Sequence, residues 1–108
     1  MSDHTFTWGG TAAAGTTTAT GYSDTHTSKK PNVSICCWLS AAGGTATVLA
    51  RRSNDATGHE TTLGTLSLSG VSDVQALDTT SAFDTIRLEV TAISGGAVVA
   101  GNIMRTHD

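Results

Sequence analysis

The chain has 108 residues, a formal net charge of −3 and only 14% charged residues. This length is typical of one domain, which buries roughly two-thirds of the surface that its unfolded chain exposes. The lysines and arginines form no long basic stripe, which argues against nucleic acid as a partner. No run approaches the roughly 20 apolar residues that span a bilayer, so we expect no membrane partner either.

Thr, Ala, Ser and Gly make up much of the sequence. Thr favours strands because its branched side chain suits a pleated surface, and Gly and Ser favour turns. The low charge is not typical of a well-dispersed monomer surface, so we expect a small β domain that belongs to an assembly. The N-terminus, MSDHTFTWGG, lacks the basic and apolar regions of a signal peptide. We therefore expect production in a cytoplasm.

The N-terminal third contains few large aliphatic side chains. The expected elements here are a short strand, a weak Thr-rich strand and a polar loop, at residues 4–8, 16–22 and 23–32. Alternation places Phe6 and Trp8 on one side of the first strand. We interpret residues 1–32 as an N-terminal arm or edge segment, next to a β-sandwich core formed by residues 33–108.

The rest of the chain is a series of β-prone runs separated by glycine-rich or polar turns. The expected strands are 33–40, 45–53, 60–69, 85–93 and 97–105. A phase shift of the apolar residues indicates a bulge at Gly64. The only helix candidate is Ser72–Leu77, and Phe83 is expected to anchor a loop at 78–84. Short strands at regular spacing predict an all-β fold, an antiparallel β-sandwich or a jelly-roll-like or Ig-like single domain.

The strand at 33–40 (VSICCWLS) carries two adjacent cysteines. Alternation places one set of side chains on the core face, Val33, Ile35, Cys37 and Leu39, and the other on the opposite face, Ser34, Cys36, Trp38 and Ser40. By the same rule Ile86, Leu88 and Val90 face inward. Adjacent cysteines on opposite faces do not favour a disulfide, and no nearby base is evident that would activate a thiol. We expect both cysteines to be structural.

Trp38 is the side chain whose position matters most for function. An outward Trp removes about 200 Å² of surface from water when a partner covers it. Two alternatives stay open: Trp38 packs under the segment 23–32, or its strand is buried on both faces. Phe6 and Trp8 either staple the N-terminal segment to its own domain or dock it on a neighbour.

No reaction motif is evident in the sequence. The four histidines, at positions 4, 26, 59 and 107, lack metal-ligand spacing, and residues 54–58 (NDATG) lack the acidic density of a calcium loop. A carboxylate pair for glycoside hydrolysis is left open by spacing alone, but so few aromatic residues do not predict a sugar cleft. No nucleophile elbow, phosphate loop or dinucleotide fingerprint is present. We expect no enzymatic activity, no cofactor and no metal ion.

Residues 33–104 resemble the small β-sandwich modules of tailed-bacteriophage structural proteins. The resemblance is carried by "TVLARRSND", "TLGTLSLSGVSDVQAL" and "AFDTIRLEVTAISGGAVVAGNI", which match a strand and turn, a short strand pair, and a penultimate strand with its closing hairpin. It covers about two-thirds of the chain. Such modules occur as head decoration (cement) proteins and as parts of tails and fibres.

The resemblance implies a virion structural protein that binds the major capsid protein and stabilises the head after assembly in the host cytoplasm. It also implies a homo-oligomer, with a trimer favoured, because such proteins often cap threefold positions. The alternative is a tail or fibre module that binds a host receptor or carbohydrate. The Thr-rich segment 16–22 could add a strand to a partner sheet. The expected partner-contact residues are Phe6, Trp8, Trp38, Arg51, Arg52 and Arg87, with the arginines pairing acidic groups.

Overall fold

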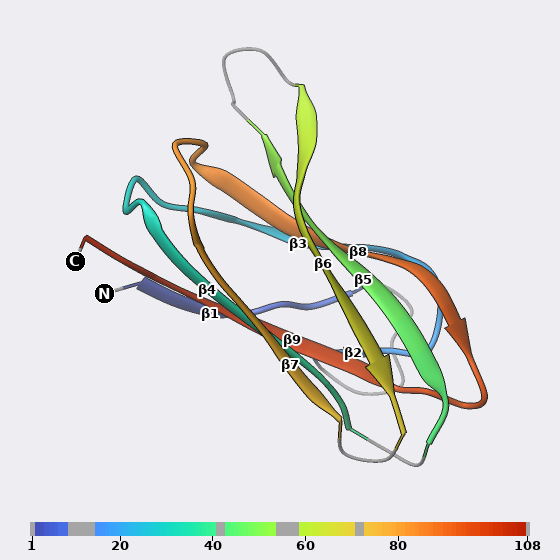
Figure 1. Cartoon of the computed structure of the whole chain (residues 1–108). Coiled ribbons are helices and arrows are strands. Elements are labelled where there is room, and N and C mark those ends of the chain that lie inside the picture. Colours follow the sequence, from blue (N-terminus) through green and yellow to red (C-terminus); the bar gives the residue numbers. More distant parts are fainter. Residues whose placement is uncertain (1, 9–14, 41–42, 54–58, 71–72, 108) are drawn as a thin grey trace.

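A computed structural model of the chain describes residues 2–8, 15–40, 43–53, 59–70 and 73–107. Two antiparallel sheets face each other in this structure (Figure 1). The strands are β1 (Ser2–Thr5), β2 (Thr16–Thr17), β3 (Gly21–Thr27), β4 (Asn32–Leu39), β5 (Thr45–Ser53), β6 (Glu60–Ser69), β7 (Val74–Thr80), β8 (Thr85–Ser94) and β9 (Val99–Thr106). The part of the chain described contains no helix long and apolar enough to cross a membrane.

The strand order is β1-β9-β4-β7 in one sheet, with β2 also paired to β9, and β3-β8-β5-β6 in the other. We call these the β4 sheet and the β5 sheet. All pairs of neighbouring strands are antiparallel. The predicted all-β class and the antiparallel β-sandwich are confirmed.

The central hairpin follows the sequence pattern closely. The predicted strands 45–53 and 60–69 coincide with β5 and β6. Ala50 pairs with Gly64 and Arg51 pairs with Thr62, so Leu63 is the extra residue of a bulge beside Gly64. This confirms the predicted irregularity, which the apolar phase shift of the sequence already indicated.

Two other predictions of local structure are wrong. Residues 74–80 form β7, which pairs with β4 along its whole length, so the helix candidate at 72–77 is a strand where the structure describes it. The expected polar loop at 23–32 contains most of β3, and the weak strand at 16–22 is divided between β2 and β3. Both errors concern edge strands, whose polar or exposed side chains give no clear alternation, and pairing with a neighbour decides their conformation.

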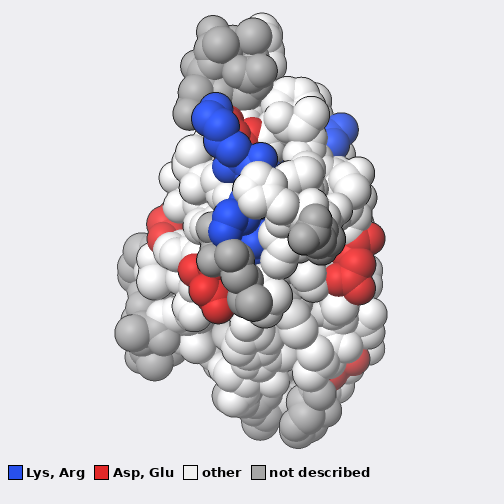
Figure 2. Space-filling view, turned by 90° about the vertical axis from the view of Figure 1, so that its left-hand side faces the viewer, with Lys and Arg blue, Asp and Glu red and all other residues white. Residues whose placement is uncertain are grey.

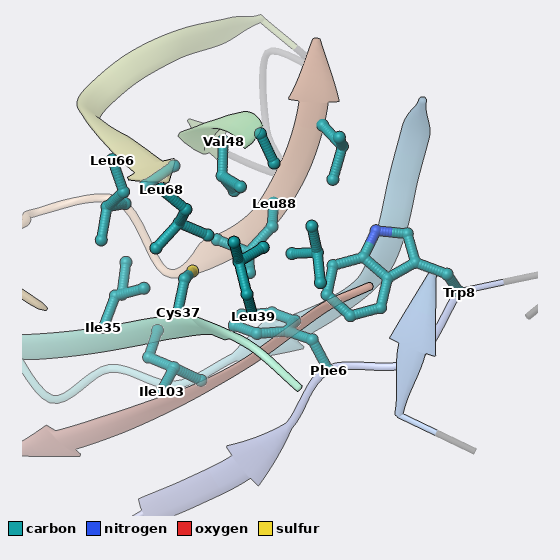
Figure 3. Packing of buried hydrophobic residues seen from close by; sticks show 14 of the residues in the cluster. Phe6, Trp8, Ile35, Cys37, Leu39, Val48, Leu66, Leu68, Leu88 and Ile103 are labelled. Atoms are coloured by element: carbon teal, nitrogen blue, oxygen red, sulfur yellow. The ribbon is translucent and has the colours of Figure 1, made fainter. Parts of the chain in front are cut away.

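The two inner faces of the sheets form the core (Figure 3). The inward sets predicted for the strands at 33–40 and 85–93 are confirmed, because all of their members are buried: Val33, Ile35, Cys37, Leu39, Ile86, Leu88 and Val90. Val48 and Ala50 of β5 are also fully buried. Alternation therefore determines which face of each central strand remains outside.

Phe6 and Trp8 belong to this core. Phe6 is fully buried and Trp8 is 7% exposed, and Figure 3 shows both rings pointing into the same cluster as Leu39 and Leu88. The prediction that these two rings contact a partner is wrong for this fold, because neither ring is presented at the surface. They staple the N-terminal segment to its own domain, which was the other alternative.

The N-terminal segment links the two sheets. The Phe6 amide donates to the Gly101 carbonyl on β9, and the Thr7 carbonyl accepts from the Asp24 amide on β3, at 3.0 and 2.8 Å. The segment therefore starts on one sheet and crosses to the other. In this fold residues 2–8 are an edge of the sandwich and not a separate arm.

A buried arginine holds the crossovers at one end of the sandwich. Arg105 of β9 is 1% exposed. Its Nε donates to the Lys30 carbonyl at 2.8 Å, and its two terminal nitrogens donate to the carbonyls of Asp84 and Phe83 at 2.9 and 3.1 Å. These carbonyls lie in the β3–β4 and β7–β8 connections, both of which pass between the sheets. A charged group is tolerated in such a place because its donors are satisfied.

Replacement of Arg105 tests this role. We expect Arg105→Leu to lower the free energy of unfolding by about 3 kcal/mol, because the variant loses three hydrogen bonds from a buried charged donor to partly buried carbonyls. Arg52→Leu is the matched control and should cost less than about 1 kcal/mol, because Arg52 is partly exposed and stacks on a ring. Urea denaturation measures both values, and equal losses would contradict the role.

Two glycine turns meet at the opposite end of the sandwich. Gly44 has φ +90° and Gly95 has φ +68°, and a Cβ on Gly95 would lie 2.9 Å from the Gly44 Cα. A Cβ on Gly44 would lie 2.4 Å from the Ser94 carbonyl oxygen. The β4–β5 and β8–β9 turns therefore touch only because both residues lack a side chain.

Replacement of Gly44 by alanine should therefore destabilise the fold. We expect Gly44→Ala to lower the free energy of unfolding by about 3 kcal/mol, through backbone strain and overpacking together. Gly70→Ala is the control, because Gly70 has a similar φ of +81° but open space around its Cβ position. It should cost about 1 kcal/mol. Urea denaturation of the two variants separates the effect of close contact from the effect of backbone strain. Equal losses of unfolding free energy in Gly44→Ala and Gly70→Ala would contradict the need for the turns to touch.

Candidate interaction surface

The outer face of the β4 sheet carries three cross-strand rows of side chains. They are Trp38 with Val74 and Ala100, Cys36 with Ala76 and Asn102, and Ser34 with Asp78 and Met104. Val74 is 57% exposed and Met104 is 42% exposed. This face is partly apolar, with Asp3 and Asp78 lining the hollows beside Met104, and an exposed apolar area rimmed by polar groups is typical of a surface that a protein partner covers.

Trp38 faces outward, as the alternation predicts. It is half-buried, like Ser34 and Cys36 on the same face, whereas every second residue of β4 is fully buried. The strand is therefore not buried on both faces. Residues 23–27 belong to β3 in the other sheet, so the alternative in which Trp38 packs under that segment is also wrong.

Two shallow hollows flank Met104 on this face. One, of about 360 Å³, is lined by Asp3, His4, Thr5, Asn102, Ile103 and Met104. The other, of about 370 Å³, is lined by Asn32, Val33, Ser34, Asp78, Thr79, Met104 and Thr106. Met104 is common to both, so its side chain separates them. Open hollows of this kind suit side chains of a partner better than an enclosed small ligand.

Arg51 and Arg87 lie on the outer face of the other sheet. Arg87 makes two hydrogen bonds to the Glu60 carboxylate, at 2.7 and 3.2 Å, and its guanidinium lies 3.7 Å from the centre of the Tyr22 ring. Arg51 reaches the same carboxylate at 3.5 Å. The two arginines therefore already share an internal partner, and they do not form one surface with Trp38.

The two arginines affect the pKa of the Glu60 carboxylate that they share. The hydrogen bond from Arg87 holds the pKa of Glu60 below its ordinary value, against the opposing effect of burial, and the pKa of Arg87 is raised by the same bond. This is the behaviour of a paired structural ion network. It ties β5, β6 and β8 together on the outside of the β5 sheet.

Arg52 belongs to a basic end of the sandwich. Its guanidinium lies 5.0 Å from the centre of the Phe83 ring, and Lys29 pairs with Asp84 at 3.5 Å. The buried Arg105 donates hydrogen bonds to the backbone carbonyls of Lys30, Phe83 and Asp84 at the same end. Figure 2 looks onto this end and shows a narrow column of Lys and Arg with acidic side chains beside it, while a further basic side chain lies apart on the right. Sequence reasoning missed this basic end because its members come from segments far apart in the chain.

The cysteines are structural in this fold. Cys37 is fully buried and Cys36 is half-buried on the opposite face, and both are free. Burial, with a smaller contribution from Cys36, raises the pKa of the Cys37 thiol to about 12. A thiol with so high a pKa is not a nucleophile at neutral pH. The described residues also contain no cluster of three or more His, Cys, Asp or Glu that could hold a metal ion.

Comparison with known protein families, with curated protein sequences and with solved structures finds no match for this chain. The resemblance of residues 33–104 to phage structural modules therefore stays a prediction. The candidate surface is argued from geometry alone. It consists of the outer face of the β4 sheet around Trp38, Val74 and Met104, with the basic end as its neighbour.

The shared role of Glu60 gives a pH-dependent prediction. We expect Glu60→Gln to lower the free energy of unfolding by about 1 kcal/mol at pH 7, because an amide pairs poorly with two guanidinium groups. Folding lowers the pKa of Glu60, so its stabilising contribution is present above the unfolded pKa of about 4.3 and is lost as the pH falls through the folded pKa. Urea denaturation should show the difference in unfolding free energy closing as the pH falls below the unfolded pKa and through the lower folded pKa. A constant difference would contradict this account.

Proposed function

We propose that this chain is a virion structural protein that decorates and stabilises a bacteriophage capsid through protein–protein contacts. The observation that carries the proposal is the partly apolar outer face of the β4 sheet, where Val74 and Met104 are exposed and Trp38 is half-buried. The resemblance of residues 33–104 to phage β-sandwich modules supplies the class of partner, which is the major capsid protein.

The distribution of exposed apolar side chains supports a contact on one face. Three large hydrophobic side chains are exposed among the described residues, Tyr22, Val74 and Met104. Two of them lie on the outer face of the β4 sheet, whereas Tyr22 on the other sheet carries the Arg87 guanidinium at 3.7 Å. Trp38 lies next to Val74 on the same face, and tryptophan is among the residue types that most often contribute the main part of the binding energy.

The physical effect on the capsid is mass action. A protein that binds the assembled shell but not its dissociated subunits lowers the free energy of the shell and stabilises it. The exposed outer face of the β4 sheet offers apolar contacts to a capsid, and Arg52 with the basic end offers charge for acidic capsid groups. We propose that the chain forms a homo-oligomer in the virion.

Binding to capsids tests the proposal. Capsids of the encoding phage, prepared without this chain, should bind the wild-type protein saturably in a sedimentation assay. Trp38→Ala and Met104→Glu should each weaken binding about 30-fold, the equivalent of about 2 kcal/mol for a central contact. Tyr22→Ala is the matched control on the other sheet, and its affinity should remain within about threefold of wild type.

Circular dichroism and thermal melting establish that each variant is folded before its affinity is compared. Equal losses of affinity in Trp38→Ala, Met104→Glu and Tyr22→Ala would contradict the assignment of binding to the outer face of the β4 sheet. A wild-type protein that ignores capsids but binds host cells or glycans would contradict the proposal and support the tail or fibre alternative instead.

A further inference from the structure

Five strands lie at the edges of the two sheets, since the two-residue β2 pairs with β9 outside the main strand order, and these edges differ in how their backbones are protected. Edge strands expose unpaired backbone groups, and proteins usually protect them by shortness, bulges, charges or proline. β1 is only four residues long, and β3 and β6 each contain a register shift against their neighbours. β7 is seven residues long and pairs with β4 without any irregularity.

The sequence of β7 also lacks protective side chains. VQALDTT contains no proline, lysine or arginine, and its only charged residue is Asp78. The Asp78 carboxylate accepts a hydrogen bond from the Ser34 hydroxyl on β4 at 2.6 Å. The charge is therefore directed toward β4, away from the open edge. Most residues of this strand are exposed, and Val74 is 57% exposed.

The hydrogen bonds that extend the β4–β7 ladder identify which backbone groups of β7 are open. The Leu39 amide donates to the Asp73 carbonyl at 3.1 Å, and the Ser81 amide donates to the Pro31 carbonyl at 2.9 Å. Because hydrogen-bonded pairs alternate along an antiparallel ladder, the odd-numbered residues of β7 bond to β4. The N–H and C=O groups of Val74, Ala76, Asp78 and Thr80 therefore point to the open edge.

We propose that two copies of the chain pair antiparallel along β7, so that one continuous sheet runs through a dimer. The register is centred on Leu77, which places Val74 opposite Thr80 and Ala76 opposite Asp78 of the second copy. This register uses every open backbone group of β7. A register centred on Asp78 would oppose two carboxylates, and one centred on Ala76 would leave Thr80 unpaired.

Leu77 adds a side-chain contact to this pairing. It is half-buried and packs against the core. It lies next to β6 at Gly64, where a Cβ would come within 2.5 Å of a Leu77 methyl group. In the proposed register Leu77 meets its counterpart in a non-hydrogen-bonded pair, where side chains are closest. The two leucines would cover the open side of both sandwiches.

The proposal goes beyond capsid binding and does not depend on it. Pairing of identical edges has twofold symmetry and closes at two copies, so it replaces the trimer that the resemblance implies. The outer faces of both β4 sheets then point the same way. Trp38 and Met104 of the two copies form one larger surface, which would raise avidity for any flat partner.

Sedimentation equilibrium of the whole chain tests the pairing. Wild type should be a dimer at micromolar concentration. Ala76→Pro should be a monomer, because proline removes an N–H that points to the open edge and none that bonds to β4. A wild-type monomer up to about 1 mM, a trimer, or an Ala76→Pro dimer of wild-type affinity would each overturn the proposal.

Two substitutions of opposite charge at position 76 test the register. This test does not require the Ala76→Pro variant to fold. Ala76→Asp places like charges opposite Asp78 of the second copy and should raise the dimer dissociation constant at least tenfold. Ala76→Lys places opposite charges there and should leave the dimer as tight as wild type at low salt. Ala92→Asp, an exposed control on β8, should not change it. Equal effects of Asp and Lys at position 76 would overturn the register.

Discussion

Burial of one face of each sheet against the other is the constraint on which the rest of the structure depends. Hydrophobic residues make up only 38% of the chain, and alternation concentrates them on the inner faces of the central strands. Because Cys37 points inward, Trp38 must point outward. Gly101 in β9 serves the same packing, since a Cβ there would lie 2.8 Å from a Leu88 methyl group. The outer surface that we assign to binding is therefore a consequence of the core.

Other contacts then hold the two sheets together at the ends and at one side of the sandwich, where the apolar core ends. Arg105 joins two crossovers at one end, and at the other end the turns of Gly44 and Gly95 touch. The N-terminal segment, with Phe6 and Trp8, closes a side. These closures leave β7 as the long edge without a bulge or a guarding charge. The same architecture thus accounts for a stable domain and for an edge that can accept a second copy.

The sequence predicted the elements in which local pattern and tertiary pairing agree. β5 and β6 are rich in β-branched residues and end at turn residues, so their bounds and the bulge are predicted from the residues alone, whereas the inward phase of β5 is not. β3 and β7 are not predicted in this way, because exposed Thr, His and Gln side chains are compatible with loops and helices until a neighbouring strand pairs with them. The inward position of Arg105 follows from the alternation of β9, but its partners come from connections far away in the sequence. The basic end of the sandwich was missed for the same reason, and of the predicted contact residues only Trp38 lies on the candidate face.

A partly apolar face, an open edge and the resemblance to phage modules together support our proposal of a subunit that lies on the outside of a capsid. Its central claim is the orientation of the chain on that capsid. The most direct measurement is a cryo-electron microscopy reconstruction of tailed-phage capsids with and without this chain bound. The account predicts additional density on the outside of the head, with the outer face of the β4 sheet and Trp38 against the shell. Density confined to the tail, no additional density, or contact through the β5 sheet would contradict it.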